Sequence, residues 1–347
     1  MSFKDLIQRP DRSKTRFDIA VLGELNLDLV LYGLPRELPE ERELLASDFT
    51  LTLGSSSGIT AHNLAVLGNK VAFVSMTGND SLGEICRQRL QQVGVSLEGI
   101  ATCKSGQGTG VTLLLPLPGT TARRILTYPG AMFEMSHDDI DEAYLASASH
   151  FHLSAFFMHR KLIPDIPALF ARMKALGLTT SLDTNDDPED EWGDPLLRTL
   201  PSVDILLCNE REVRKIAQCD DAVEAARKLA QTVPLIVVKC GASGARAICR
   251  GQELFAPGNR VDTVDAIGAG DSFNAGFLHR WLRGGDLEAC LKFGNLTGAL
   301  STTRRGGTEA FRDQAYLEQV LRGHWAKAEN ESAAENQEQK VGARIEG

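Results

Sequence analysis

The sequence has no apolar run that approaches the roughly 20 residues needed to cross a bilayer. Its first residues, MSFKDLIQRPDRSKTR, carry charges where a signal peptide has its apolar segment. Positive charge is also in deficit, because 37 Lys and Arg face 46 Asp and Glu, for a formal net charge of -9. Sequence-independent nucleic-acid binders need a basic surface. We therefore expect a cytoplasmic protein with small-molecule ligands and with neither nucleic-acid nor membrane partners.

Paired cysteines are missing as well. The chain has 7 cysteines, an odd number, and they are scattered without any C-x-x-C pair. Such spacing does not predict a disulfide framework or a zinc site. We expect buried, reduced thiols.

Apolar residues make up 43% of the chain and charged residues 24%, which is close to the average for globular proteins. Short β-branched runs alternate with helical patterns such as 164–176 and 222–231. The runs that we interpret as buried parallel strands are 19–22, 71–74, 150–153, 179–182, 205–207 and 235–238. This alternation predicts a doubly wound α/β fold, with a mostly parallel sheet flanked by helices on both faces.

The segments outside this alternation suggest the domain organisation. Residues 1–16 and 323–347 are polar, and we interpret them as tails on one domain that spans 17–322. Two stretches, about 31–53 and 110–128, contain strand-like runs broken by Gly and Pro. We expect them to form a small β lid over the carboxyl edge of the main sheet, where α/β proteins bind ligands.

The most informative segment is Gly268-Ala269-Gly270-Asp271. A helical pattern follows it and ends at Gly284-Gly285, so the glycines lie at a helix start. Exposed N–H groups, the positive end of the helix dipole and close backbone approach together predict an anion hole for a phosphate. Asp271 is then placed to accept a proton from a substrate hydroxyl that attacks a γ-phosphorus.

The same residues allow a plainer interpretation, in which Asp271 only caps an ordinary glycine turn. If Asp271 is the base, we expect the helix start to lower its pKa. Two other nucleotide motifs are excluded. Position 273 holds Phe where a dinucleotide fingerprint needs a third glycine, and there is no G-x-x-x-x-G-K-[ST] loop.

This segment resembles the C-terminal signature of the ribokinase-like (PfkB) carbohydrate kinase family. Further motifs of that family are resembled elsewhere, in the order in which the family has them along the chain. The N-terminal signature of that family is resembled by Gly54-Ser55-Ser56-Ser57-Gly58, Gly78-Asn79-Asp80 and Gly83. Asn209-Glu210-Arg211-Glu212 resembles its N-x-x-E element. The resemblance spans roughly residues 17 to 322 and implies ATP and Mg²⁺ as nucleotide and metal.

The resemblance also implies roles for individual residues. The acceptor-binding residues implied are Asn26, Asp28, Gly54 and Ser55. The nucleotide-binding residues implied are Asn209, Glu212, Lys239, Gly241, Gly244 and Asn295. Glu212 is implied to hold Mg²⁺ through water, whereas Asp265 and the Ile267 carbonyl resemble a monovalent-cation site, so K⁺ is a further expected cofactor. An exposed lid edge suggests a homodimer through the lid.

Several of these residues also have a structural interpretation that the sequence leaves open. Asn209 and Glu212 have the spacing of a capping box, and Lys239 fits a solvated strand edge as well as a phosphate contact. The segment around Asp183 and Asn185 fits either a pocket support or an acidic turn. Ser55 and Ile59 depart from the family pattern at glycine and asparagine positions, which leaves the acceptor open.

Polar residues elsewhere receive weaker predictions. We expect His62 and Asn63 on a solvated helix face, and His150 and His152 in the core or its rim rather than at a metal. Arg123 and Arg124 either meet an anionic substrate or solvate a strand edge.

The function predicted is therefore an ATP-dependent kinase that phosphorylates a hydroxyl of a sugar or sugar acid, with Asp271 as general base. A nucleoside kinase of the same fold is the nearest alternative. Its base platform would have to come from aromatic residues such as Tyr32, Phe49 or Tyr128. A catalytically silent sugar or nucleotide sensor is the alternative from another class.

Overall fold

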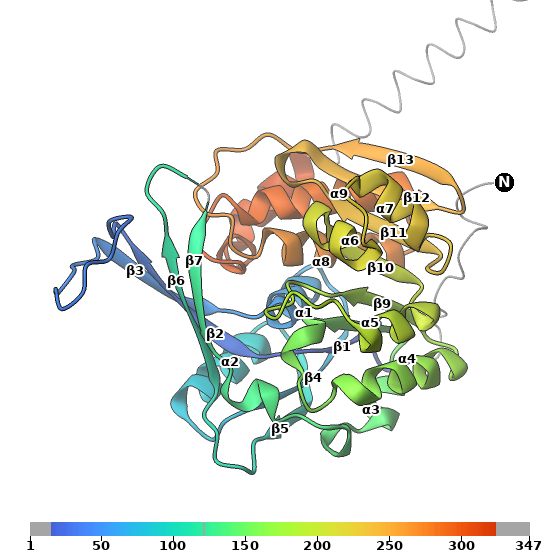
Figure 1. Ribbon diagram of the computed structural model, residues 1–347, viewed down its shortest axis with the longest axis horizontal. Helices are drawn as coiled ribbons and strands as arrows, with labels where there is room; N and C mark the ends of the chain where they lie inside the picture. Colours follow the sequence, from blue (N-terminus) through green and yellow to red (C-terminus); the bar gives the residue numbers. More distant parts are fainter. Residues whose placement is uncertain (1–14, 121, 324–347) are drawn as a thin grey trace, which may run out of the picture.

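The computed structural model describes residues 15–120 and 122–323 (Figure 1). The predicted tails 1–16 and 323–347 therefore lie almost entirely outside the described residues. Within the described part, no helix is both long and apolar enough to span a membrane.

A large, mostly parallel sheet forms the centre of the described chain. It has nine strands in the order β13-β12-β11-β10-β9-β8-β1-β4-β5, and only β12 and β13 join it in antiparallel fashion. The strands are β1 (Ile19–Leu22), β4 (Val71–Thr77), β5 (Ser96–Thr102), β8 (His150–Ser154), β9 (Thr179–Asp183), β10 (Ile205–Asn209), β11 (Leu235–Lys239), β12 (Gly244–Cys249) and β13 (Gln252–Pro257). Every strand run predicted from the sequence lies in this sheet. The edge strand β5 was missed because it is only half-buried and lacks a continuous apolar run.

Helices cover both faces, which confirms the predicted doubly wound fold. One face carries α1 (Ser56–Val66), α2 (Ser81–Gln91), α8 (Ala269–Leu282) and α9 (Leu287–Ser301). The other carries α3 (Glu142–Ala146), α4 (Ile166–Ala175), α5 (Asp194–Thr199), α6 (Glu210–Ala217) and α7 (Ala222–Leu229). The short helix α10 (Glu309–Arg312) packs beside α9. Two separate apolar cores, one on each side of the sheet, hold the three layers together.

The lid is a separate four-stranded sheet in the order β3-β2-β6-β7. Its strands are β2 (Asn26–Tyr32), β3 (Asp48–Leu53), β6 (Gly110–Pro116) and β7 (Arg123–Tyr128), and Figure 1 shows it projecting from the body. The lid starts earlier than the predicted boundary at residue 31, because Asn26 and Asp28 lie on β2 rather than in a loop. Their side chains alternate with those of Leu27 and Leu29, as the period of a strand requires.

Contacts between lid and body fix the inner end of the lid. Val30 and Leu114 of the lid form a small apolar cluster with Ile267. Next to it, the Tyr32 hydroxyl donates a hydrogen bond to Asp265 Oδ2 at 3.1 Å. The lid is therefore anchored to the segment that leads into α8.

The strand order reverses between β1 and β8, since the chain passes from β1 to β4 on one side and returns to β8 on the other. Ligand sites of open α/β sheets lie at the carboxyl ends of the strands at this switch point. The strands β8, β9, β10 and β11 end there in Ser154, Asp183, Asn209 and Lys239.

Candidate active site

A cleft of about 820 Å³ lies between the carboxyl edge of the main sheet and the inner face of the lid. The predicted site residues that line it are Asn26, Asp28, Ser55, Asn209, Glu212, Lys239, Gly241, Ile267, Gly268, Ala269, Gly270 and Asp271. Four others, Gly54, Gly244, Asp265 and Asn295, are not among its lining residues. The fold thus brings most of the predicted site together from segments far apart in the sequence.

The predicted anion hole is the first turn of α8. Gly268 is the N-cap with φ 70° and ψ 9°, a left-handed conformation, and a Cβ there would lie 2.6 Å from Gly307 Cα. Only glycine fits this position. Among the described residues we find no hydrogen-bond acceptor for the N–H of Gly270 or Asp271. The Ala269 N–H donates to Ala266 O over a long distance of 3.4 Å. These N–H groups are available to an anion.

Asp271 lies in that turn and is only 9% exposed. Burial, and after it the negative charge of Asp183, raise the pKa of Asp271 to about 6 against the opposing charge of Lys239. The predicted lowering of this pKa was wrong, because loss of water outweighs the helix terminus. A carboxylate with a pKa near 6 is a better proton acceptor at neutral pH than one with an ordinary pKa.

A buried ion pair lies behind the first turn of α8. Lys239 Nζ is 2.7 Å from Asp183 Oδ2, and Asn274 of α8 donates to the same oxygen. A Cβ on Gly270 would be 3.5 Å from Lys239 Nζ, so the ammonium lies directly beside the anion hole. Burial alone would lower the Lys239 pKa, but the charges of Asp183 and Glu212 and the hydrogen bond to Asp183 together raise it above its ordinary value. Lys239 is therefore a fixed positive charge, and the solvated-edge interpretation was wrong.

Asn26 and Asp28, the predicted acceptor-binding residues, form a hydrogen-bonded pair in the lining of the cleft. Asn26 Nδ2 donates to Asp28 Oδ1 at 3.2 Å and to Thr112 Oγ1 at 3.0 Å. Burial raises the Asp28 pKa to about 7. A Cβ on Gly54 would lie 2.2 Å from Asp28 Oδ1, so Gly54 acts by letting this pair pack closely rather than by lining the cleft.

The start of α1 adds polar groups to the cleft. Ser55 is its N-cap, and its hydroxyl accepts a hydrogen bond from Gly58 N at 3.1 Å. The next residue, Ser56, lines the cleft and receives a hydrogen bond from the Asn185 amide. Asn185 also lines the cleft, whereas Asp183 is fully buried, so this segment supports the pocket instead of forming a solvated acidic turn.

Glu24 is a cleft residue to which the sequence analysis gave no role. One of its oxygens accepts from Ser56 N at 2.6 Å and the other from Ser57 Oγ at 3.0 Å. Burial raises its pKa to about 7. The available signal was a single carboxylate directly after the apolar strand β1.

Asn209 and Glu212 also line the cleft, at the start of α6. They form a capping box in which Asn209 accepts from Glu212 N at 2.9 Å and Glu212 accepts from Asn209 N at 2.8 Å. Glu212 is 6% exposed, and burial raises its pKa to about 7. The capping interpretation is confirmed, and it leaves both side chains at the cleft surface.

The remaining predicted nucleotide residues are not among the lining residues of the cleft. Gly244, with φ 121°, would bring a Cβ within 2.1 Å of Ala256 O, so it serves the tight turn into β12. Asn295 Nδ2 donates to Ala256 O at 2.9 Å and to Pro257 O at 3.1 Å. The amide of Asn295 thus ties α9 to β13 and faces the backbone rather than the cleft.

The predicted monovalent-cation site is a well-bonded loop. Asp265 accepts hydrogen bonds from Ile267 N at 2.9 Å and Gly306 N at 3.2 Å, in addition to that from Tyr32. The described residues contain no group of three or more His, Cys, Asp or Glu suited to hold a metal ion. Glu212, which was predicted to hold Mg²⁺ through water, lines the cleft.

The other polar residues singled out from the sequence are structural. His62 and Asn63 are buried rather than solvated, and Asn63 Nδ2 donates to Ser272 Oγ at 3.0 Å, which ties α1 to α8. His150 and His152 are core residues, as expected, and both hydrogen-bond Ser181 Oγ at 2.7 Å.

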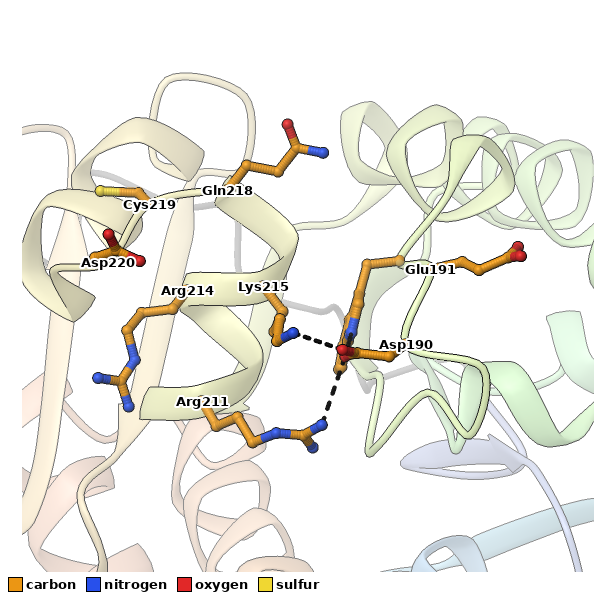
Figure 2. A pocket seen from close by; sticks show the side chains of 9 residues that line it. Asp190, Glu191, Arg211, Arg214, Lys215, Gln218, Cys219 and Asp220 are labelled. Atoms are coloured by element: carbon orange, nitrogen blue, oxygen red, sulfur yellow. Dashed lines mark hydrogen bonds and ion pairs between the residues drawn. The ribbon is translucent and has the colours of Figure 1, made fainter.

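A second hollow of about 590 Å³ lies on the outer side of α6. Figure 2 shows Lys215 and Arg211 of α6 directed at Asp190, at 2.6 Å and 3.5 Å. Two of its three cationic lining residues are thus paired with Asp190, and the third, Arg214, donates to Glu210 O at 2.8 Å. No predicted site residue lines this hollow. The cleft under the lid is the better candidate.

The three-layer body and the β lid over the switch point define the class of ribokinase-like proteins. Comparison with known proteins supports the same conclusion. The chain belongs to the pfkB family of carbohydrate kinases, whose family model matches residues 16–314. It is accordingly a phosphotransferase with an alcohol group as acceptor.

Individual relatives are similar over most of the chain. An ATP-dependent ribose-1-phosphate kinase of Halopiger xanaduensis is 31% identical over 259 residues, covering 74% of this chain and 82% of the relative. A 5-dehydro-2-deoxygluconokinase of Shouchella clausii is 26% identical, covering 85% and 92%. A crystal structure from E. coli described as ribokinase II, with ATP and Mg²⁺, is 23% identical with a TM-score of 0.78, covering 88% and 99%.

Proposed function

We propose that the protein transfers the γ-phosphoryl group of ATP, bound with Mg²⁺, to a hydroxyl of a sugar or sugar acid. The observation that carries the proposal is the position of Asp271. It lines the cleft at the start of α8, and the same cleft is lined by the Asn26–Asp28 pair and by Asn209 and Glu212.

Each part of the cleft has a role in this reaction. Asn26 and Asp28 orient the acceptor, and Asp271 accepts the proton of the attacking hydroxyl. The N–H groups of Ala269, Gly270 and Asp271 stabilise the negative charge of the transferred group, with Lys239 beside them. Mg²⁺, when bound, neutralises charge on the phosphates, and the lid excludes water that would compete as a nucleophile.

The test is ADP formation with Mg²⁺ and K⁺ against a panel of sugars, sugar acids and nucleosides. Asp271→Asn is expected to reduce kcat about 10²-fold or more and to leave nucleotide binding intact, because only the proton acceptor is lost. Near-normal turnover by this variant would contradict the role of Asp271. A protein that binds ATP but turns over no acceptor would favour the silent sensor.

The aromatic residues expected to form a nucleobase platform are absent from the lining of the cleft, and the aromatic residue found there among the described residues is Phe133. None of Tyr32, Phe49 and Tyr128 lines the cleft. Tyr32 is bonded to Asp265, Phe49 is 65% exposed, and the Tyr128 hydroxyl donates to Gln107 at 2.8 Å. The expected platform for a nucleobase is therefore not formed by these residues.

Potassium activation stays part of the proposal, at the loop of Asp265 and Ile267. Because Asp265 already accepts three hydrogen bonds, a cation there would rely mainly on backbone carbonyls. Equal activity after replacement of K⁺ by a large organic cation would remove this part. The cytoplasmic location also stays a prediction.

We also propose a homodimer through the outer face of the lid. Side chains of the lid strands alternate, so Asn26, Asp28, Thr112 and Thr127 face the cleft while their neighbours face away. The outward set includes Phe49 at 65% exposure, Leu126 at 54% and Tyr128 at 49%. A second copy of the same face would cover these apolar side chains.

A further inference from the structure

The charges that line the cleft are unequally paired. Its cationic lining residues among the described part of the chain are Arg123 and Lys239. Lys239 is bound to Asp183 at 2.7 Å. The side chain of Arg123 on β7 forms no hydrogen bond and no ion pair with any residue that the structure describes. The residue is half-buried, and its Nε atom is enclosed.

Strand alternation directs Arg123 inward. Arg123, Ile125 and Thr127 of β7 line the cleft, whereas Arg124 points to the other face and donates to Arg36 O at 2.9 Å. The pairing of β7 with β6 fixes this orientation, because Thr112 faces Thr127 and Leu114 faces Ile125 on the cleft side. The sequence could not choose between substrate contact and strand-edge solvation for Arg123, but the register does.

The charge of Arg123 acts on the acceptor side of the site. Burial raises the pKa values of Asp28 and Asp271, and the positive charge of Arg123 is among the effects that lower them. Asp28 is a predicted acceptor-binding residue and Asp271 is the proposed base, so the guanidinium lies near the proposed position of the acceptor. It stands on the lid, opposite the sheet edge that carries Asn209 and Glu212.

An enclosed guanidinium N–H group without a hydrogen-bond partner is costly. A neutral sugar would supply only hydroxyl acceptors. A planar carboxylate or a tetrahedral phosphate would supply two charged oxygens. Arginine can donate two parallel, charge-assisted hydrogen bonds to such a pair.

We propose that Arg123 selects an acceptor that already carries an oxyanion, namely a sugar phosphate or a sugar acid, and binds that group during phosphoryl transfer. This inference rests on the proposed kinase function and names its substrate class. The oxyanion lies against β7, while a hydroxyl on another part of the same acceptor faces Asp271.

The test compares matched acceptors with and without the charge. ADP formation is measured with ribose 1-phosphate against ribose, and with 5-dehydro-2-deoxygluconate against glucose, for the wild type and three variants. The wild type is expected to prefer the charged member of one pair at least 10²-fold in kcat/KM, and which pair responds distinguishes phosphate from carboxylate.

Arg123→Gln is expected to lower kcat/KM for that charged acceptor about 30- to 100-fold, mainly through KM, and to lower it far less for the neutral partner. Arg123→Lys should fall between, because it keeps the charge but loses the paired hydrogen bonds. Arg124→Gln, which alters the neighbouring residue on the outer face, is the matched control and should match the wild type.

Three results would overturn the inference. The first is a wild type that prefers the neutral acceptors, and the second is an Arg123→Gln variant with unchanged kinetics. The third is an Arg123→Gln variant whose kcat falls equally for charged and neutral acceptors, which would assign the guanidinium to the transferred phosphoryl group. Equilibrium dialysis with the charged sugars in the absence of ATP measures their binding directly. It therefore separates failure of the Arg123 inference from failure of the kinase proposal. If no acceptor is turned over, weaker binding by Arg123→Gln still supports the subsite, and equal binding rejects it.

Discussion

As the proposed base, Asp271 must meet two requirements, because it has to be ionised to accept a proton and also basic enough to hold it. Its pKa of about 6 meets both at neutral pH, and the cause is burial, followed by the Asp183 charge. The neighbouring Lys239 keeps the pKa from rising further, so the local charge network sets the working range of the base.

This pKa predicts the pH dependence of the reaction. Only the deprotonated base is active, so kcat/KM should rise about tenfold per pH unit below pH 6 and level off above it. The measurement is kcat/KM from pH 5 to 8.5 with ADP quantified directly. Asp271→Asn should lose this acidic limb, and a limb that persists in the variant would assign the titration to another carboxyl of the cleft.

The effect of burial on the Glu24 pKa can be tested through the pH dependence of the free energy of unfolding. Its pKa is raised from 4.5 to about 7 in the folded protein, so the folded state binds the extra proton between those pH values. The free energy of unfolding therefore loses up to about 3 kcal/mol from this group as the pH rises from 4.5 to 7.

Glu24→Gln is expected to remove this loss. It should be more stable than the wild type at pH 8 by about 1–3 kcal/mol and equally stable near pH 4, as measured by urea unfolding without ligands. Exposed Glu43→Gln serves as the control and should show no such pH-dependent difference. A wild-type advantage at pH 8 would mean that the hydrogen bonds of the Glu24 carboxylate outweigh its desolvation.

At the scale of elements, the first turn of α8 depends on two glycines for different reasons. Gly268 needs its left-handed conformation and the close approach to Gly307, whereas the nearest atom to a Cβ on Gly270 is Lys239 Nζ at an ordinary 3.5 Å. The same Gly→Ala change should therefore have unequal effects two residues apart.

Gly268→Ala is expected to cost more than about 2 kcal/mol of unfolding free energy, from backbone strain and the clash. Gly270→Ala should stay within about 1 kcal/mol of the wild type, because alanine favours a helix. Thermal and urea unfolding of the two variants measure this difference. Equal losses would show that the turn adapts around Gly268.

At the scale of the whole molecule, the lid joins the two proposals that go beyond the basic reaction. Its inner face carries Arg123 and the acceptor contacts, and its outer face carries the exposed apolar side chains. The inner and outer faces of the lid belong to one four-stranded sheet. Dimer formation through the outer face would therefore hold in place the same strands that carry the proposed acceptor contacts.

The oligomer prediction can be tested by mass. The wild type should elute as a dimer in size-exclusion chromatography with light scattering, and Phe49→Lys/Leu126→Lys should be a monomer. Leu176→Lys is the matched control, because Leu176 is 62% exposed directly after α4 on the body, and it should stay dimeric. A monomeric wild type would contradict the proposal.

Local patterns were sufficient for much of the fold. The apolar runs predicted most of the parallel strands because fully buried strands need continuous apolar sequence, and Gly268-Ala269-Gly270-Asp271 predicted a helix start because both signals lie within one turn. The half-exposed β5 and the start of the lid at Asn26 were missed, since their alternation is short and partly polar.

What the sequence alone determined is therefore the sheet, the glycine turn and the residue types gathered at strand ends. The tertiary structure decided the properties that depend on partners distant in the chain. Asp183 pairs with Lys239, 56 residues later, and with Asn274, 91 residues later. Burial reversed the expected pKa shift of Asp271, and the pairing of β6 with β7 turned Arg123 into the cleft. Desolvation, charge pairing and strand register arise only when separate segments pack together. A sequence pattern can therefore identify residues such as Asp271 and Arg123, but it does not determine their charge state, partners or orientation.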